Sequence, residues 1–132
     1  MSDCVFCQIV TGQLFAYKIY EDDNFLGFLD IKPLNLGNSL LIPKKHFRWV
    51  YDVPNFGQYW QVAQKIALAS IKSLNAESVS FLTLGYEIPH AHIRIIPRFP
   101  ADAHQHGIDI SQIQTIAKTE MQDIAQKIKN LL

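Results

Sequence analysis

Residues 89–98 read Pro-His-Ala-His-Ile-Arg-Ile-Ile-Pro-Arg, and polar side chains alternate with apolar ones through most of this segment. Alternation with a period of two is typical of a half-buried strand, because successive side chains point to opposite faces of a sheet. The pattern places His90, His92 and Arg94 on the same face. Three nitrogen-bearing side chains in a row suit the binding of an anion, although an ordinary polar strand surface is an alternative interpretation of the same residues.

Four other segments have strand patterns, and all of them precede this one in the sequence. They are Ile19–Glu21, Phe25–Leu29, Ser39–Ile42 and Val79–Leu84. The polar residues 22–24 between the first two predict a hairpin. A tight connection around Gly85 leads to the strand at 90–96, so the last two strands are expected to pair in the antiparallel sense.

Three segments instead show the apolar spacing of helices. A short helix is expected to carry Cys4 and Cys7 on one side. A long central helix spans about 55–74, and its expected core face consists of Trp60, Ala63, Ala67, Ile71 and Leu74. A C-terminal helix over about 111–131 begins at Ser111 in a capping-box pattern. Since strands and helices do not alternate strictly, we expect an α+β fold, with a sheet of about five antiparallel strands covered on one side.

The size and charge of the chain limit what it can do. The 132 residues, 48% of them hydrophobic, are enough for one domain over residues 1–132 with its own core. Twelve Lys and Arg balance twelve Asp and Glu, which leaves no broad basic surface for duplex nucleic acid or an anionic membrane. Without a leader pattern or a run of roughly 20 apolar residues, a soluble cytoplasmic protein is expected. The two cysteines, separated by two residues, suit a metal site or a redox pair better than a disulfide staple.

Six short motifs, in order between about residues 3 and 98, resemble those of the histidine triad (HIT) superfamily. They are Cys4-Val5-Phe6-Cys7, Tyr20-Glu21-Asp22, Phe28-Leu29-Asp30-Ile31, Pro33-Leu34-Asn35, Leu41-Ile42-Pro43-Lys44-Lys45-His46 and Pro89-His90-Ala91-His92-Ile93-Arg94-Ile95-Ile96-Pro97. The resemblance implies the HIT-like fold and a nucleotide hydrolase or nucleotidyl transferase, usually a homodimer. In that family the middle histidine of a His-x-His-x-His signature attacks the α-phosphorus and forms a covalent nucleotidyl-histidine, and His92 takes its place here.

The third position of the signature is Arg94, where relatives have a histidine that contacts the phosphate and the leaving group. A neutral imidazole is a good nucleophile near neutral pH, so His92 keeps its implied role, with His90 and Arg94 beside it as further catalytic candidates. A guanidinium neutralises charge on a phosphate but is a poor proton donor to a leaving group. We therefore expect nucleotide binding to be retained, together with either a preference for better leaving groups or much reduced turnover.

Zinc-containing members of the family resemble this chain at four positions, namely Cys4, Cys7, His46 and His90. Two thiolates and two imidazoles complete a tetrahedral site with no open position, so the resemblance implies a structural Zn²⁺. The Cys-x-x-Cys pair by itself is a weak signal, because such cysteines also occur as redox sites or as small buried residues.

The resemblance also implies where a purine nucleotide or nucleotide conjugate binds. Asp30 corresponds to the acidic residue that receives the ribose hydroxyls, and Gly85 is the clear match in the phosphate loop. The residues that correspond to the wall around the base are Val5, Phe6, Ile9, Phe28 and Leu29. The competing interpretation is that these apolar residues are plain core and that Asp30 is a turn residue. A second His-x-His, at His104 and His106, is expected to lie in a solvated loop.

The leading hypothesis is a HIT-family hydrolase that acts on a nucleoside phosphoramidate, an adenylated amine or a dinucleoside polyphosphate. The alternative is a catalytically weakened nucleotide-binding or scaffold protein with the same fold. In it, Arg94 and Glu87 have removed the activity, since Glu87 stands where some relatives have a small hydroxyl residue that touches phosphate, and a carboxylate there repels an anion. A zinc-clipped redox or nucleic-acid protein is a third hypothesis, which the neutral charge and the absence of further metal-ligand pairs in the sequence disfavour.

Overall fold

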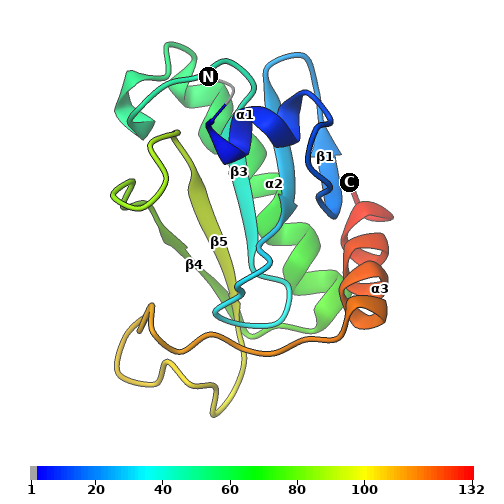
Figure 1. Cartoon of the computed structure of the whole chain (residues 1–132). Helices are drawn as coiled ribbons and strands as arrows, with labels where there is room; N and C mark the ends of the chain where they lie inside the picture. Colours follow the sequence, from blue (N-terminus) through cyan, green and yellow to red (C-terminus); the bar gives the residue numbers. More distant parts are fainter. Residues whose placement is uncertain (1–2) are drawn as a thin grey trace.

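The computed structural model describes residues 3–132, which form an α+β fold (Figure 1). Its elements are α1 (Val5–Val10), β1 (Lys18–Glu21), β2 (Phe25–Leu29), β3 (Ser39–Pro43), the 3-10 turn η1 (Val50–Asp52), α2 (Phe56–Leu74), β4 (Ser78–Leu82), β5 (Ile93–Arg98) and α3 (Lys118–Lys129). The five strands form one sheet in the order β1-β2-β3-β5-β4, and every neighbouring pair is antiparallel. The fold class expected from the sequence is therefore confirmed. Within residues 3–132, no helix combines the length and hydropathy needed to cross a membrane.

Both faces of the sheet are covered, whereas the sequence predicted cover on one side. On one face, α2 and α3 pack over strand residues such as Phe25, Leu29 and Leu41. On the other face, α1 contributes Phe6 and Ile9 to a second cluster with the strand residues Leu26, Phe28, Leu40 and Ile42. Alternation along β2 and β3 thus supplies both clusters. The second cluster fixes α1, with its cysteines, against the sheet.

The central helix has the predicted length, but its buried face is rotated relative to the prediction. Its buried residues are Tyr59, Val62, Ala63, Ile66, Ala67, Ala69 and Ser70. Of the residues expected in the core, Ala63 and Ala67 are buried, whereas Trp60, Ile71 and Leu74 are only partly buried. Trp60 and Leu74 still pack against the core, and Trp60 and Ile71 line a groove between α2 and β4. The prediction was wrong here because α2 carries two adjacent apolar stripes, and the position of the sheet determines which of them is buried.

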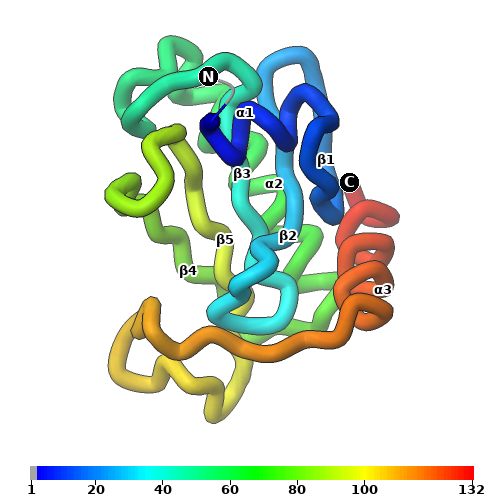
Figure 2. Tube along the Cα trace, in the orientation of Figure 1, coloured from blue at the N-terminus to red at the C-terminus, as the bar shows by residue number. Residues whose placement is uncertain are grey.

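The C-terminal helix begins at Lys118, and the predicted start at Ser111 is wrong. The hydroxyl of Ser111 donates to a neighbouring carboxylate at 2.6 Å and does not cap a helix. Residues 99–117 instead form a strap that leaves β5 and crosses the end of the sheet to reach α3 (Figure 2). The backbone N–H of Gln114 donates to a carbonyl of the β2–β3 loop at 2.8 Å, which ties the strap to that loop. Three β-branched residues, 113, 115 and 116, favour this extended path.

Asp102 anchors the start of the strap. Its side chain is 5% exposed. The carboxylate accepts hydrogen bonds from the Arg98 guanidinium (2.9 and 3.1 Å), the Asn35 amide (2.8 Å) and the backbone N–H groups of Phe99 (3.1 Å) and His104 (3.0 Å). The Arg98 guanidinium holds the pKa of Asp102 well below its usual range. The ionised carboxylate therefore stabilises the native state.

We expect Asp102→Asn to lower the free energy of unfolding at pH 7 by about 2–4 kcal/mol, because the substitution removes the charge and several of its hydrogen bonds. Since the folded-state pKa is depressed, this contribution is complete above the unfolded value near pH ~4 and is lost as the pH falls below it. Urea denaturation should accordingly show the difference between wild type and variant narrowing below pH ~4. A difference that stays constant from neutral to acidic pH would contradict this role.

Candidate functional site

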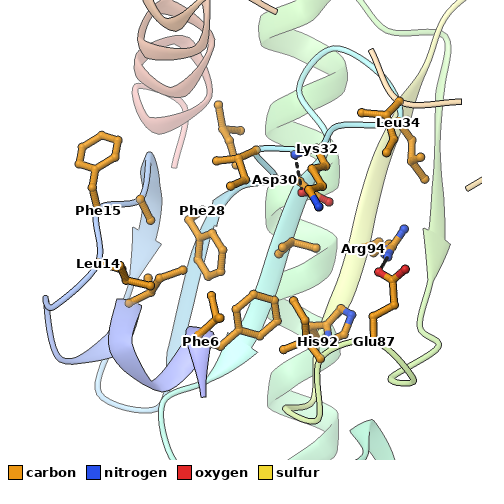
Figure 3. Close-up of a pocket in the computed structure, with 18 of the residues that line it drawn as sticks. Phe6, Leu14, Phe15, Phe28, Asp30, Lys32, Leu34, Glu87, His92 and Arg94 are labelled. Carbon is orange, nitrogen blue, oxygen red and sulfur yellow. Dashed lines mark hydrogen bonds and ion pairs between the residues drawn. The ribbon is translucent and has the colours of Figure 1, made fainter. Parts of the chain in front are cut away.

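A pocket of about 660 Å³ opens on the face of the sheet that α1 covers. It is bounded by α1 and the loop after it, β2 and the loop after it, β3, β5 and the segment before it, and the strap. Figure 3 shows aromatic side chains on one side of the pocket, among them Phe6, Phe15 and Phe28, and polar ones on the other, namely His92, Glu87 and Arg94. Asp30 and Lys32 lie between the two sides. This division suits a ligand with an apolar ring at one end and an anion at the other.

His92 lies directly before β5, and only 5% of the residue is exposed. Its ring contacts the backbone carbonyl oxygen of His90 through Nδ1 at 2.7 Å. Because a carbonyl can only accept, Nδ1 carries the proton and Nε2 keeps its lone pair. Burial lowers the pKa of His92, so the ring is neutral near pH 7. Phe6 packs edge-on against the ring, with 5.3 Å between the centroids, and the result is a neutral and oriented nucleophile that lines the pocket.

Arg94 lines the same polar side of the pocket from β5. Its side chain is 15% exposed, and its Nε is buried with no hydrogen-bond partner among the described residues. One terminal nitrogen, Nη2, lies 4.0 Å from Oε2 of Glu87, at the limit of an ion pair. A buried donor without a partner costs free energy, so this guanidinium is suited to donate to an anionic ligand.

The residues predicted to surround the base all line the pocket; they are Val5, Phe6, Ile9, Phe28 and Leu29. Asp30 lines it as well, at the end of β2. Its carboxylate accepts a hydrogen bond from the backbone N–H of Lys32 at 2.9 Å, while burial raises its pKa. Asp30 thus places a carboxylate between the apolar wall and the polar side of the pocket.

Gly85 does not line the pocket. It has a φ of +77°, and its carbonyl oxygen accepts a hydrogen bond from Arg48. A side chain at this position would bring Cβ to 3.0 Å from the Trp49 ring. The glycine is therefore required by the backbone conformation and by contact with a tryptophan, and the structure gives it no contact with the pocket.

Several pocket residues could not be identified from the sequence. Leu14 and Phe15 come from the loop after α1, and Ile110 and Ile113 come from the strap. The strap was predicted to begin a helix, so its contribution to the pocket was missed. The signal that was present is a series of isoleucines spaced among polar residues, of which Ile110 and Ile113 remain about half exposed in the structure.

His90 departs from the predicted arrangement, because β5 begins at Ile93 and not at His90. The backbone N–H of Ala91 donates to a carbonyl in the loop after β3 at 2.7 Å, so the chain is not yet paired as a strand. The predicted common face is right for His92 and Arg94, which both line the pocket, and wrong for His90, which is buried outside it. Alternation of side chains holds only where the backbone is a regular strand.

Cys4, Cys7, His46 and His90 converge next to α1, and their four ligand atoms all lie within 4.8 Å of one another. Three of the Sγ to Nδ1 distances are 3.3, 3.4 and 3.5 Å, and the two Nδ1 atoms are 3.1 Å apart. In a tetrahedron with Zn–S of about 2.3 Å and Zn–N of about 2.0 Å, the corresponding edges are about 3.5 Å and about 3.3 Å. The spacing of the ligand atoms therefore fits a tetrahedral zinc ion.

The chemistry of these ligands fits a zinc ion as well. The ring of His90 donates from Nε2 to the carbonyl oxygen of Pro43 at 2.9 Å, which leaves the lone pair on Nδ1, toward the cysteines. Burial lowers the pKa of His90 to about 4, so it is a neutral ligand. Burial also raises the pKa of the Cys7 thiol to about 11, and the neighbouring Cys4 adds to this effect. A divalent cation supplies the positive charge that two adjacent thiolates need.

The second His-x-His, at residues 104 and 106, lies in the strap, away from the pocket. His104 is buried, which contradicts the expected solvated loop, whereas His106 is exposed. The Nδ1 of His104 accepts from the backbone N–H of Asp109 at 3.0 Å, so Nε2 carries the proton and donates to the carbonyl oxygen of Leu34 at 2.8 Å. The ring thus joins the strap to the β2–β3 loop, and neither histidine lines the pocket.

Comparison with known protein families gives a match over most of the chain. The family model described as HIT domain matches residues 11–101. An uncharacterized HIT-like protein of Borreliella burgdorferi is 40% identical over 77% of this chain and 80% of that protein. An adenylylsulfatase of Arabidopsis thaliana is 38% identical over 76% of this chain and 55% of that protein.

Solved structures show the same architecture. A zinc-bound histidine triad family protein of Mycobacterium smegmatis superposes with a TM-score of 0.83 at 30% identity and covers 98% of this chain and 93% of its own. A hypothetical histidine triad nucleotide-binding protein of Sulfolobus tokodaii has a TM-score of 0.84 at 27% identity, over 97% of this chain and 91% of its own.

Proposed function

Because the chain belongs to the HIT domain family, we propose that it hydrolyses a nucleotide conjugate by transferring the nucleotidyl group first to His92 and then to water. The substrate class is a nucleoside phosphoramidate, an adenylated amine or a dinucleoside polyphosphate. The observation that carries the proposal is the geometry of His92, a buried neutral imidazole whose Nδ1 proton is engaged and whose Nε2 keeps a lone pair at the polar side of the pocket. Covalent catalysis needs a nucleophile of this kind.

The proposed reaction has two steps. In the first, the lone pair of His92 Nε2 attacks the α-phosphorus, and the bond to the leaving group breaks with its electron pair on the leaving atom. In the second, water attacks the phosphorus, the bond to Nε2 breaks, and the proton lost by water passes to solvent. The hydrogen bond from Nδ1 to the carbonyl of His90 stabilises the positive ring of the intermediate, and Arg94 neutralises the phosphate oxygens.

The nucleoside is proposed to occupy the aromatic side of the pocket. An edge-to-face pair of Phe6 and Phe28, with 5.6 Å between the ring centroids, forms an apolar wall suited to a purine. Asp30 is placed to accept hydrogen bonds from the ribose hydroxyls, since its carboxylate lines the pocket and accepts from the backbone N–H of Lys32 through Oδ1. Ile110 and Ile113 of the strap complete the apolar surface.

We further propose that a structural Zn²⁺ is held by Cys4, Cys7, His46 and His90. When bound, the ion would supply a rigid link between α1, the loop after β3 and the segment before β5. His90 would join this link to the catalytic side, because its carbonyl oxygen accepts the hydrogen bond that orients His92. A reducing compartment such as the cytoplasm keeps both thiols available to the metal.

The proposed activity is tested by incubating the wild-type protein with adenosine phosphoramidate while AMP release and the intact protein mass are followed. Release of AMP, or a trapped adduct with the mass of one nucleotidyl group, is the expected result. If AMP binds but neither release nor adduct is seen, the weakened binding protein is the correct description.

A homodimer is proposed as well, on the basis of the family and of the groove between α2 and β4. This groove is lined by the partly buried Trp60 and by the exposed Leu68 and Phe81, and β4 is an edge strand of the sheet. Light scattering at micromolar concentration should give twice the monomer mass of 15.1 kDa, and Leu68→Glu should reduce it toward the monomer value. A monomer mass for the wild type would count against the dimer.

A further inference from the structure

The charged and titratable side chains on the polar side of the pocket differ in their depth below the surface. His92 is 5% exposed, the Arg94 side chain is 15% exposed, and the Glu87 side chain is 82% exposed. All three line the same pocket, and Figure 3 shows them together at one end of it. A group displaced from phosphorus by His92 must leave away from the attacking nitrogen, toward solvent. Glu87 is the most exposed of the three, so it is the side chain placed to meet a group that departs toward solvent.

The contact between Glu87 and Arg94 is weak enough for a substrate to open it. The closest atoms, Arg94 Nη2 and Glu87 Oε2, are 4.0 Å apart, and an ion pair of this length whose carboxylate is exposed to solvent contributes little free energy. The buried Nε of Arg94 has no partner among the described residues. A phosphate that receives donors from Arg94, Nε included, gains charge-assisted hydrogen bonds that Glu87 does not make. Glu87 is then free to face the group attached to the phosphorus.

We propose that Glu87 is a specificity-determining residue that favours leaving groups departing as amines over leaving groups departing as anions. The inference rests on the proposed function, because it concerns the first step of that reaction. When the bond from phosphorus to an amine nitrogen breaks, its electron pair stays on the nitrogen, which takes up a proton from solvent and becomes an amine or ammonium ion. A carboxylate beside this nitrogen accepts its N–H hydrogen bonds and stabilises the developing positive charge.

The same carboxylate disfavours a leaving group that departs as sulfate or polyphosphate. Here the electron pair leaves on an oxygen, no proton is required, and negative charge accumulates next to Glu87. Repulsion between this charge and the Glu87 carboxylate disfavours an anionic leaving group relative to an amine. The pocket offers Arg94 as compensation, but the α-phosphate already occupies its donors. Arg94, which is a poor proton donor, is then compatible with turnover, since Glu87 supplies the electrostatic help that an amine needs.

The test compares two substrates that share the adenosine and the α-phosphate and differ in the leaving group. These are adenosine phosphoramidate, which releases ammonia, and adenylylsulfate, which releases sulfate. For wild type and Glu87→Gln, kcat/KM is measured with both. In Glu87→Gln, kcat/KM for adenosine phosphoramidate is expected to fall and kcat/KM for adenylylsulfate to rise. The ratio of the first value to the second should then fall by about tenfold or more. Glu87→Asp keeps the charge and should keep the preference for the amine.

Glu120→Gln is the matched control, because Glu120 is exposed on α3, lies outside the pocket lining, and undergoes the same loss of charge. It should leave the ratio unchanged. An unchanged ratio in Glu87→Gln, with both substrates still hydrolysed, would overturn the inference and leave the proposed function intact. Failure of the wild type to hydrolyse either substrate would overturn the proposed function, and the inference with it.

Discussion

Replacement of His92 by alanine is expected to lower AMP release from adenosine phosphoramidate by about 10³-fold or more, as the loss of a covalent nucleophile does in other enzymes. The nitrogen that would bond to phosphorus is absent from the variant, and among residues 3–132 none of the others that line the pocket is a histidine or cysteine. The adduct in the intact-mass spectrum should disappear together with the activity. Retention of AMP binding should be measured in parallel, because the apolar wall is untouched.

His106→Ala serves as the control for this substitution. His106 is exposed and lies outside the pocket lining, so the control should keep wild-type activity. If His92→Ala releases AMP at the wild-type rate while folded and binding AMP, then His92 is not the nucleophile. The proton on Nδ1 and the lone pair on Nε2 of His92 would then have no catalytic role.

Removal of zinc is expected to have a comparably large effect on stability. We expect purified protein to contain about one zinc ion per chain, and Cys7→Ala to contain much less. A ligand that binds only the folded state stabilises it by about 4 kcal/mol when its free concentration is 1,000 times its Kd. Chelation should therefore lower the free energy of unfolding by a similar amount or more, as metal analysis and urea denaturation together would reveal.

The control for metal loss is again His106→Ala, which should keep both its zinc and its stability, since this histidine is outside the cluster. Protein that is purified without zinc, and that forms a disulfide between Cys4 and Cys7 in air, would support the redox interpretation instead. Bound zinc and disulfide chemistry exclude each other here, because the metal uses both thiolates as ligands.

The four candidate zinc ligands show that a sequence motif can identify residues without predicting how their side chains are arranged. The resemblance selected Cys4, Cys7, His46 and His90, and the structure brings the four ligand atoms to tetrahedral spacing. Alternation along the strand, however, placed His90 beside His92 on one face. The chain is not yet a strand at His90, and its side chain is turned toward the cysteines. A contact between segments some forty to ninety residues apart in sequence thus overrides a local period.

His104, unlike the four metal-ligand candidates, was not expected to have a structural role. Its neighbours are polar, and local composition predicts a solvated loop. The ring is nevertheless buried, since one nitrogen accepts from the strap and the other donates to the β2–β3 loop. Burial of a polar ring is tolerated when both nitrogens find partners, and these partners depend on the tertiary fold.

Patterns within short windows were sufficient for the strands of the sheet and the length of the central helix, because side-chain period and turn residues act between near neighbours. The family resemblance, and not a local pattern, selected the apolar residues that line the pocket beside α1. Long-range packing was needed to select the buried stripe of α2, to hold the strap extended along the end of the sheet, and to bring Glu87 within 4.0 Å of Arg94. Each of these depends on which surfaces the sheet and the loops present to residues distant in the sequence. The difference in free energy between one buried stripe or chain path and another comes from those long-range contacts and not from local backbone preference.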